Sequence, residues 1–163
     1  MKIWAMPVAR PYMLNAMRTA ELLQADFSAI GVKADIVTME WAEYLAKSRA
    51  KDRDGAVILG WTGDNGDPDN FLNTLLSCGA VGGNNRAQWC NEEFDALLTK
   101  AKETSDQAER TKLYEQAQVV FKREGPWATL DHSIVSMPMS KKVTGYIMNP
   151  LGVHDFQTVD ITE

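Results

Sequence analysis

The chain has 163 residues, of which 24% are charged and 45% hydrophobic, and its formal net charge is −5 at pH 7. These proportions are typical of a globular protein with room for one sizeable core. The negative charge and the lack of a basic run argue against nucleic acid as a partner. No apolar stretch approaches the length that crosses a bilayer, so we expect a protein that is not embedded in a membrane.

The first sixty residues alternate strand-like and helix-like segments. Residues 3–6, 32–38 and 56–60 are short apolar runs bounded by Gly or Pro, which predicts three strands. Between them, apolar side chains recur every three or four positions over residues 17–30, and a shorter helical pattern covers residues 41–51. Strand–helix–strand units in series predict a parallel sheet with right-handed crossovers.

A glycine-rich acidic loop, residues 60–71, follows the third predicted strand. Gly63 lies inside this loop, and glycines and a proline in quick succession force the chain to turn. Asp67 and Pro68 then have the pattern of a helix N-cap and first helical residue. The acidic loop is therefore expected at the C-terminal end of a strand, where open α/β sheets bind ligands.

The aspartates of the acidic loop are Asp64, Asp67 and Asp69, and several interpretations compete. A calcium loop fails on spacing, because Gly66 and Pro68 occupy positions that must supply side-chain oxygens. A hydrolase could use paired carboxylates as acid and base, although no His or Cys nucleophile lies nearby in the sequence. We expect Asp67 and Asp69 to cap the backbone. Asp64 precedes the helix and is free to receive a cation, such as the ammonium group of a ligand.

Two further helices are predicted downstream. Asn91 and Asp106 are their expected N-caps, and Gly125 with Pro126 ends the second helix. Residues 127–135 carry enough β-forming side chains for one more strand.

The last part of the chain has no sustained period of either kind. We expect it to be irregular from Met137 onward, with a short extended piece near residues 143–146. The predicted organisation is thus a ligand-binding α/β lobe at residues 1–136 and a tail at residues 137–163.

The two cysteines, Cys78 and Cys90, are separated by a loop rich in glycine and asparagine. A disulfide across this loop would stabilise the fold by about 3 kcal/mol. Zinc would need more ligands than lie nearby, and two unrelated buried thiols are the remaining possibility. A disulfide implies export, whereas Met1 and Lys2 do not open a signal peptide, which by itself suggests the cytoplasm. A chain that is a fragment of an exported protein reconciles the two observations.

Arg10 follows the first predicted strand, and Asp64 follows the third. Because neighbouring strands are about 4.8 Å apart, the two side chains could face each other across the same edge of the sheet. They could form a surface salt bridge worth about 0–1 kcal/mol. They could also stay apart as opposite poles for a zwitterion, since the charged ends of a dipeptide are separated by about 6 Å. Trp41 and Trp61 are expected at this edge, either as core aromatics or as walls of a side-chain pocket.

Four stretches together closely resemble the peptide/nickel solute-binding family (family 5) that feeds ABC importers, and its dipeptide-binding members in particular. They are Trp4-Ala5-Met6-Pro7-Val8-Ala9-Arg10-Pro11-Tyr12, the acidic loop, Ser77-Cys78 with Trp89-Cys90, and Tyr146 with Asn149-Pro150-Leu151-Gly152. The resemblance runs through essentially the whole chain and implies a periplasmic-binding-protein type II-like lobe. Such a lobe has a mostly parallel sheet flanked by helices and a C-terminal crossover tail. It would be the C-terminal third of a two-lobed protein whose N-terminal lobe is missing here.

The resemblance also implies roles for individual residues. Asp64 matches the acidic anchor for the amino terminus of the ligand, and Gly63 lies beside it. Arg10 matches the arginine that binds the carboxylate of the ligand in the dipeptide-binding members. Trp41 and Trp61 match tryptophans that line the side-chain pocket. The cysteine pair matches a disulfide of the dipeptide-binding members.

As a whole, the resemblance implies a periplasmic solute-binding component with no catalytic activity and no cofactor. Its partners would be a dipeptide, the permease subunits of an ABC importer and the missing N-terminal lobe of the same protein. The signal peptide would be absent because the chain is a fragment. A haem- or glutathione-binding relative is the alternative within the family, and a carboxylate-based hydrolase is the alternative from another class.

Overall fold

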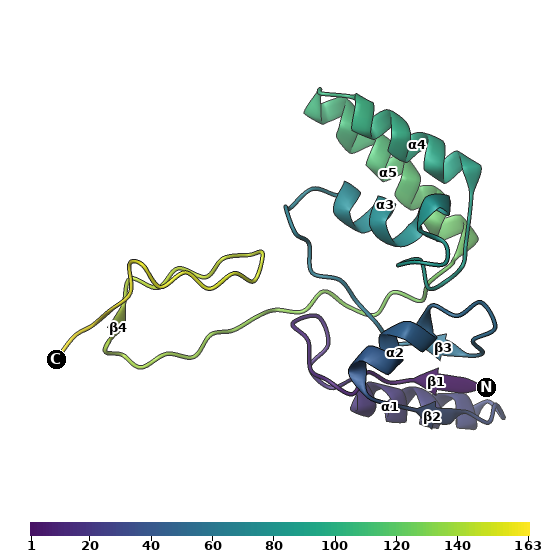
Figure 1. Cartoon of the computed structure of the whole chain (residues 1–163), viewed down its shortest axis with the longest axis horizontal. Coiled ribbons are helices and arrows are strands. Elements are labelled where there is room, and N and C mark those ends of the chain that lie inside the picture. The colour runs from purple at the N-terminus through teal and green to yellow at the C-terminus, as the bar shows by residue number, and fades with distance from the viewer.

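The computed structural model describes residues 1–163. It contains a three-stranded sheet, a group of helices and an extended C-terminal tail (Figure 1). In chain order the elements are β1 (Lys2–Trp4), α1 (Ala16–Ala29), β2 (Asp35–Val37), α2 (Trp41–Ser48), β3 (Ala56–Val57), α3 (Asp69–Leu76), the 3-10 turn η1 (Cys78–Ala80), α4 (Glu92–Glu103), α5 (Gln107–Glu124), β4 (Val143–Thr144) and β5 (Asp160–Ile161).

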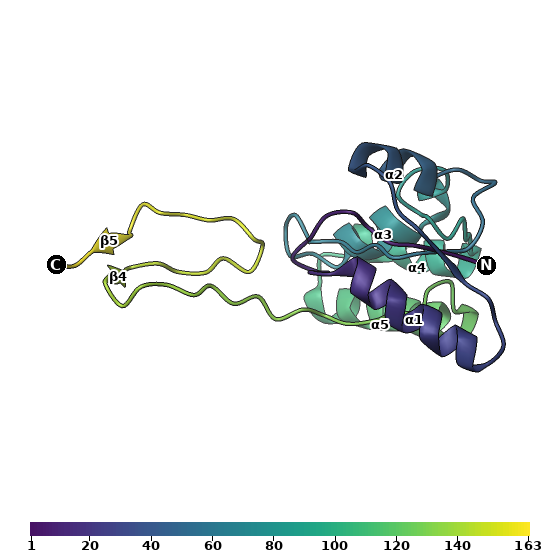
Figure 2. The same ribbon diagram turned by 90° about the horizontal axis from the view of Figure 1, so that it is seen from below.

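The predicted parallel sheet is confirmed, with strand order β2-β1-β3. Ile3 of the central strand β1 pairs with Ile36 of β2 on one side and with Ala56 of β3 on the other. The strands are shorter than the sequence predicts, because β2 and β3 each have only the short strand β1 to pair with. Helices α1 and α2 lie on opposite sides of β1 (Figures 1 and 2). Because the three strands are parallel, their C-terminal ends all lie at the same edge of the sheet.

The core around this sheet combines aliphatic and aromatic side chains. Ile3 and Ala5 are fully buried, and Ala20 of α1 is small enough to let the helix lie close to β1. Tyr44 of α2 is also fully buried in this cluster.

A second core lies between α3, α4 and α5, and α4 packs along α5 (Figure 1). The predicted caps are confirmed. The Asn91 side chain accepts a hydrogen bond from the backbone N–H of Phe94 at 3.0 Å, and the Asp106 side chain accepts one from Glu109 at 2.8 Å. Gly125, with φ of 61°, ends α5. None of the helices is both long and apolar enough to cross a membrane.

The predicted strand at residues 127–135 is wrong, because this segment has no regular structure and no neighbouring strand with which to pair. Its β-forming side chains are exposed, and Ile134 is 92% exposed. Beyond it the chain extends away from the rest of the molecule (Figures 1 and 2). The extended piece predicted near residues 143–146 is confirmed as β4, which pairs with β5 in an antiparallel hairpin. The division into residues 1–136 and 137–163 stays a prediction.

Candidate ligand-binding site

Two of the predicted residues, Arg10 and Asp64, follow the C-terminal ends of the neighbouring parallel strands β1 and β3. Arg10 follows β1 and begins a tight turn, in which its backbone and that of Met13 exchange hydrogen bonds of 3.0 and 2.9 Å. The turn carries Tyr12, whose ring lies against Gly60 just after β3. A Cβ atom at Gly60 would lie 2.4 Å from the Tyr12 ring, so only glycine fits there.

Arg10 lies on a stack of aromatic rings. Its guanidinium carbon is 4.7 Å from the centroid of the Trp41 ring, and Trp41 stacks on Tyr44 with centroids 5.8 Å apart. The Tyr44 hydroxyl lies 2.9 Å from the Trp4 carbonyl oxygen and 2.8 Å from that of Ile58. Burial raises the pKa of Tyr44, which keeps the hydroxyl neutral as a donor. The stack therefore ties Arg10, through a cation–π contact, to the central strand β1 and to the end of β3.

Asp64 is held by a residue that the sequence analysis did not single out. Asn70, in the first turn of α3, accepts hydrogen bonds at its Oδ1 from Trp61 Nε1 (2.8 Å) and from the Asp64 backbone N–H (3.0 Å). Its Nδ2 donates to Asp64 Oδ2 at 3.0 Å. One carboxylate oxygen of the exposed Asp64 side chain thus stays free for another donor.

Gly63 is buried beside the ring of Phe71. A Cβ atom at this position would lie 2.7 Å from Phe71 Cε2, so a larger residue would displace the ring or the loop. Gly63 therefore sets the path of the loop that presents Asp64.

The expectation that Asp67 and Asp69 cap the backbone holds for Asp67 and is wrong for Asp69, whose buried Oδ1 has no hydrogen-bond partner. Asp67 accepts a hydrogen bond from the Asp69 backbone N–H at 2.9 Å, as expected of a cap. It also forms a bidentate ion pair with Arg110 of α5, at 3.0 and 3.1 Å. The Arg110 guanidinium holds the pKa of Asp67 below its usual range. Arg110 lies far away in the sequence, and no local pattern indicated it.

Neither Arg10 nor Asp64 takes part in an ion pair. The salt bridge that the sequence left open is therefore absent, and the role of the two residues as opposite poles stays a prediction. Arg10 lies with Trp41, and Asp64 lies with Trp61 through Asn70.

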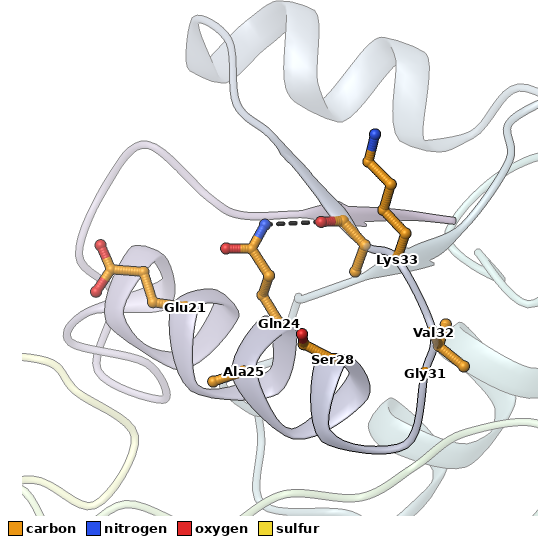
Figure 3. A pocket seen from close by; sticks show the side chains of 8 residues that line it. Glu21, Gln24, Ala25, Ser28, Gly31, Val32 and Lys33 are labelled. Carbon is orange, nitrogen blue, oxygen red and sulfur yellow. Dashed lines mark hydrogen bonds between the residues drawn. The ribbon is translucent and has the colours of Figure 1, made fainter.

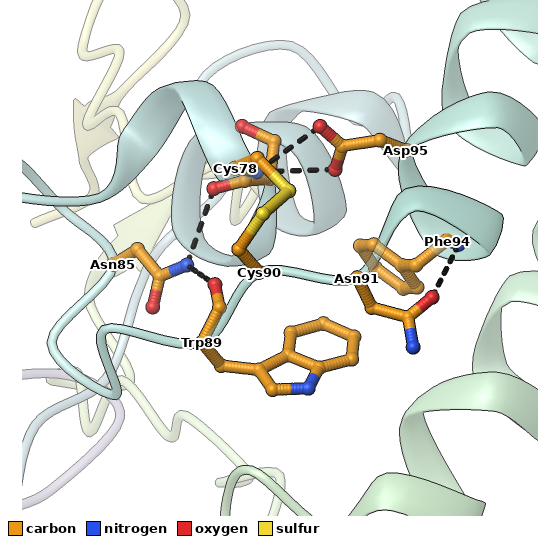
Figure 4. The surroundings of a disulfide bond; sticks show 8 residues. Cys78, Asn85, Trp89, Cys90, Asn91, Phe94 and Asp95 are labelled. Carbon is orange, nitrogen blue, oxygen red and sulfur yellow. Dashed lines mark hydrogen bonds between the residues drawn. A yellow bond between two sulfur atoms is a disulfide. The ribbon is translucent and has the colours of Figure 1, made fainter.

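Cys78 and Cys90 form a disulfide with an S–S distance of 2.09 Å (Figure 4). The carboxylate oxygens of Asp95 each lie 3.1 Å from the Cys78 backbone N–H, which donates to them. Asn85, fully buried in the loop, donates to the carbonyl oxygens of Ser77 (3.2 Å) and Trp89 (2.7 Å). The loop is thus fixed against the start of α4.

A polar hollow lies elsewhere, between α1 and the segment that leads into β2 (Figure 3). Gln24 bridges it by donating to the Ala34 carbonyl oxygen at 2.7 Å. Because residues 31–34 precede β2, this hollow is at the opposite end of the strands from Arg10 and Asp64. None of the predicted site residues lines it.

Residues 4–83 match the family model of the bacterial extracellular solute-binding proteins, family 5, middle region. The dipeptide-binding protein of Escherichia coli is 51% identical over 161 residues, which are 98% of this chain and 30% of that protein. The chain belongs to the family 5 solute-binding proteins. The heme-binding protein A of Haemophilus influenzae is 46% identical over 159 residues, 97% of this chain and 29% of that protein.

A solved family 5 structure has the same fold. The dipeptide-binding protein of Pseudoalteromonas sp. SM9913, crystallised in complex with Met-Leu, superposes with a TM-score of 0.85 at 40% identity. The match covers 99% of this chain and 32% of that one. The likeness confirms the predicted periplasmic-binding-protein lobe. The chain spans about 30% of the length of these solute-binding relatives.

Proposed function

We propose that this chain is the ligand-binding second lobe of a periplasmic dipeptide-binding protein that serves an ABC importer. The proposal rests on one observation above all. Arg10 follows β1 and Asp64 follows β3, which are neighbouring parallel strands, and each side chain is held by its own neighbours without an ion pair between the two. An Asp carboxylate accepts from an ammonium group, and an Arg fork grips a carboxylate.

The whole protein would recognise the two charged ends of a peptide and bury its side chains beside Trp41 and Trp61. Both tryptophans are only half-buried, so their rings still offer surface to a ligand. Closure of the second lobe would then remove the charges from water and present the complex to the permease subunits. The relatives named for dipeptides support this ligand class.

The tail supports the existence of a second lobe. From Met137 to Ile161 it exposes several large apolar side chains, a pattern expected of a surface that another part of the protein covers. Its turn at Gly152 lies beside Thr62 of the acidic loop. We therefore propose that residues 137–163 return to the missing N-terminal lobe, next to the ligand site.

Solute binding accounts for the loop better than hydrolysis does. Asp67 is engaged by Arg110, and Asp69 lies within the first turn of α3. A hydrolase that needs paired carboxylates would have Asp64, which is exposed, and Asp69, whose Oδ1 is buried away from water without a hydrogen-bond partner. The family relatives are named for the solutes they bind, and one is named for haem.

Isothermal titration of the complete protein with a zwitterionic dipeptide tests the proposal. The same dipeptide is also titrated after blocking its amino end and, separately, its carboxyl end. We expect each block to weaken binding by about 2–5 kcal/mol, because each leaves one protein charge unpaired. An effect of the amino block alone would assign Arg10 a structural role and indicate a longer peptide. No binding at all would favour haem or glutathione.

The isolated chain should bind the same dipeptide far more weakly than the complete protein. One lobe supplies only part of the contacts, and the charges of the ligand stay in water. Comparable affinities would contradict the two-lobed mechanism.

A further inference from the structure

The buried side chains of this lobe form two separate clusters. The sheet unit, β1 to β3 with α1 and α2, encloses one, and the helical unit, α3 to α5 with the disulfide loop, encloses the other. Arg10 and Trp41 belong to the sheet unit. Trp61 packs on the core of the helical unit, and Asn70 of α3 holds Asp64. The two charged poles of the site are therefore carried by different packing units.

Three side-chain hydrogen bonds join the two units, and all three connect the end of α2 and the residues just after it with the disulfide loop. Arg86 Nε lies 3.3 Å from Ser48 Oγ. Arg53 Nη2 donates to the Arg86 carbonyl oxygen at 2.9 Å, and Gln88 Nε2 donates to the Arg49 carbonyl oxygen at 3.1 Å. We call these contacts the seam.

Arg86 is the central residue of the seam. It is 9% exposed and has no carboxylate partner, and its Nη1 donates to the Gly83 carbonyl oxygen and to Asn84 Oδ1. Burial, and then the neighbouring Arg49, lower the pKa of Arg86 to about 10, so the side chain is still charged at neutral pH. A buried charge without an anion is costly, and an apolar side chain would avoid that cost. Stability alone therefore does not account for an arginine here.

Both ends of the seam lead to the ligand poles. On the helical side, the loop that carries Arg86 follows α3, whose Asn70 holds Asp64, and the disulfide and the buried Asn85 fix this loop (Figure 4). On the sheet side, Ser48 lies one turn after Tyr44 on α2, and Tyr44 supports the Trp41 ring on which Arg10 lies. Arg86 thus connects the supports of the two poles.

We propose that Arg86 is a positioning residue that fixes the separation of the Arg10 and Asp64 poles and thereby selects the length of the bound peptide. The inference rests on the proposed function. Each added residue lengthens an extended peptide by about 3.3–3.6 Å, so a small change in the pole separation discriminates a dipeptide from a tripeptide.

Titration of the complete protein with dialanine and trialanine tests the length selection. We expect Arg86→Gln to weaken dialanine binding about tenfold without weakening trialanine binding, because a changed pole separation weakens one of the two charge contacts of the shorter peptide. Arg86→Lys, which keeps the charge, should restore part of the ratio of dialanine affinity to trialanine affinity. Arg123→Gln removes an exposed arginine that pairs with Glu93, and it should leave the ratio unchanged. Equal losses for both peptides, or no change for either, would overturn the proposal.

A distance measurement tests the positioning without a ligand. Nitroxide labels on Ala25→Cys of α1 and Glu115→Cys of α5, both exposed positions, report the separation of the two units by double electron–electron resonance. We expect a shifted or broader distribution in Arg86→Gln and in the milder variant Gln88→Ala, and no change in Arg123→Gln.

An unchanged distance distribution in the seam variants would overturn the positioning role, and Gln88→Ala decides the matter if Arg86→Gln does not fold. Failure of the unsubstituted protein to bind dialanine would instead contradict the proposed function. The two failures are therefore distinguishable.

Discussion

The two poles of the site are held in different ways. Arg10 lies on the face of Trp41, a contact that fixes its height above the ring but tolerates sliding across it. Asp64 exchanges two directional hydrogen bonds with Asn70, which donates to its carboxylate and accepts from its backbone N–H, and which also accepts from Trp61. The comparison suggests a rigid anchor for the amino end of the ligand and a more adaptable one for its carboxylate. In the complete protein, substitutions at the two poles should therefore weaken dipeptide binding to different extents.

Removing the rigid anchor should have the largest effect. Asp64→Ala is expected to weaken dipeptide binding by about 2–5 kcal/mol, because the ammonium group would be buried without its partner. Titration calorimetry measures this loss, and thermal unfolding of the same variant serves as the control for folding. Unchanged affinity would show that the amino end binds elsewhere.

Loosening the rigid anchor should have an intermediate effect. Asn70→Ala removes three hydrogen bonds that orient Trp61 and Asp64, and should weaken binding by about 1–3 kcal/mol. Asn73→Ala, in the next turn of α3, is a matched control whose side chain makes none of these contacts. An equal loss in both variants would indicate a general effect on α3.

Disturbing the adaptable pole should cost less. Trp41→Leu keeps an apolar side chain beside Tyr44 but removes the ring beneath Arg10, and should weaken binding by about 0.5–1 kcal/mol. The loss should shrink for a dipeptide whose carboxyl end is blocked, and what remains is the part that comes from the side-chain pocket. A loss of the same size with both peptides would make Trp41 a pocket wall alone and not a support for Arg10.

The smallest effect concerns stability rather than binding. Arg110 depresses the folded-state pKa of Asp67. The ionised Asp67 side chain therefore stabilises the fold above the usual aspartate pKa, near 4, and this stabilisation is lost as the pH falls through the folded-state pKa. Asp67→Asn should therefore flatten the decline of the free energy of unfolding in that acid range. Denaturant titrations across the range measure the slope. If Asp67→Asn leaves this pH dependence unchanged, the ion pair with Arg110 is not its source.

The sequence was sufficient for features that depend on local pattern. The strand–helix alternation predicted the parallel sheet. Asn91 and Asp106 predicted the starts of two helices, because an N-cap hydrogen bond joins residues only three positions apart. The parallel pairing of β1 with β3 agrees with the expectation that Arg10 and Asp64 follow neighbouring strands.

Features that depend on distant partners could not be read from the sequence. Residues 127–135 have β-forming side chains, but a strand also requires a neighbour, and this chain supplies none there. Arg110 meets Asp67 across 43 positions, which no periodicity encodes. Asn70 is only six positions from Asp64, yet its role depends on where its amide points. The resemblance to family 5, rather than spacing, supplied the ligand roles of Arg10 and Asp64.

The most direct test of two-pole recognition combines a substitution at each pole with a matching change in the ligand. Arg10→Gln and Asp64→Asn are titrated with a free dipeptide, its amide and its amino-blocked form. We predict that Arg10→Gln abolishes the preference for the free acid over the amide but keeps the preference for a free amino end, and that Asp64→Asn does the reverse. If Arg10→Gln still prefers the free acid, the carboxylate is bound elsewhere and the central claim is wrong.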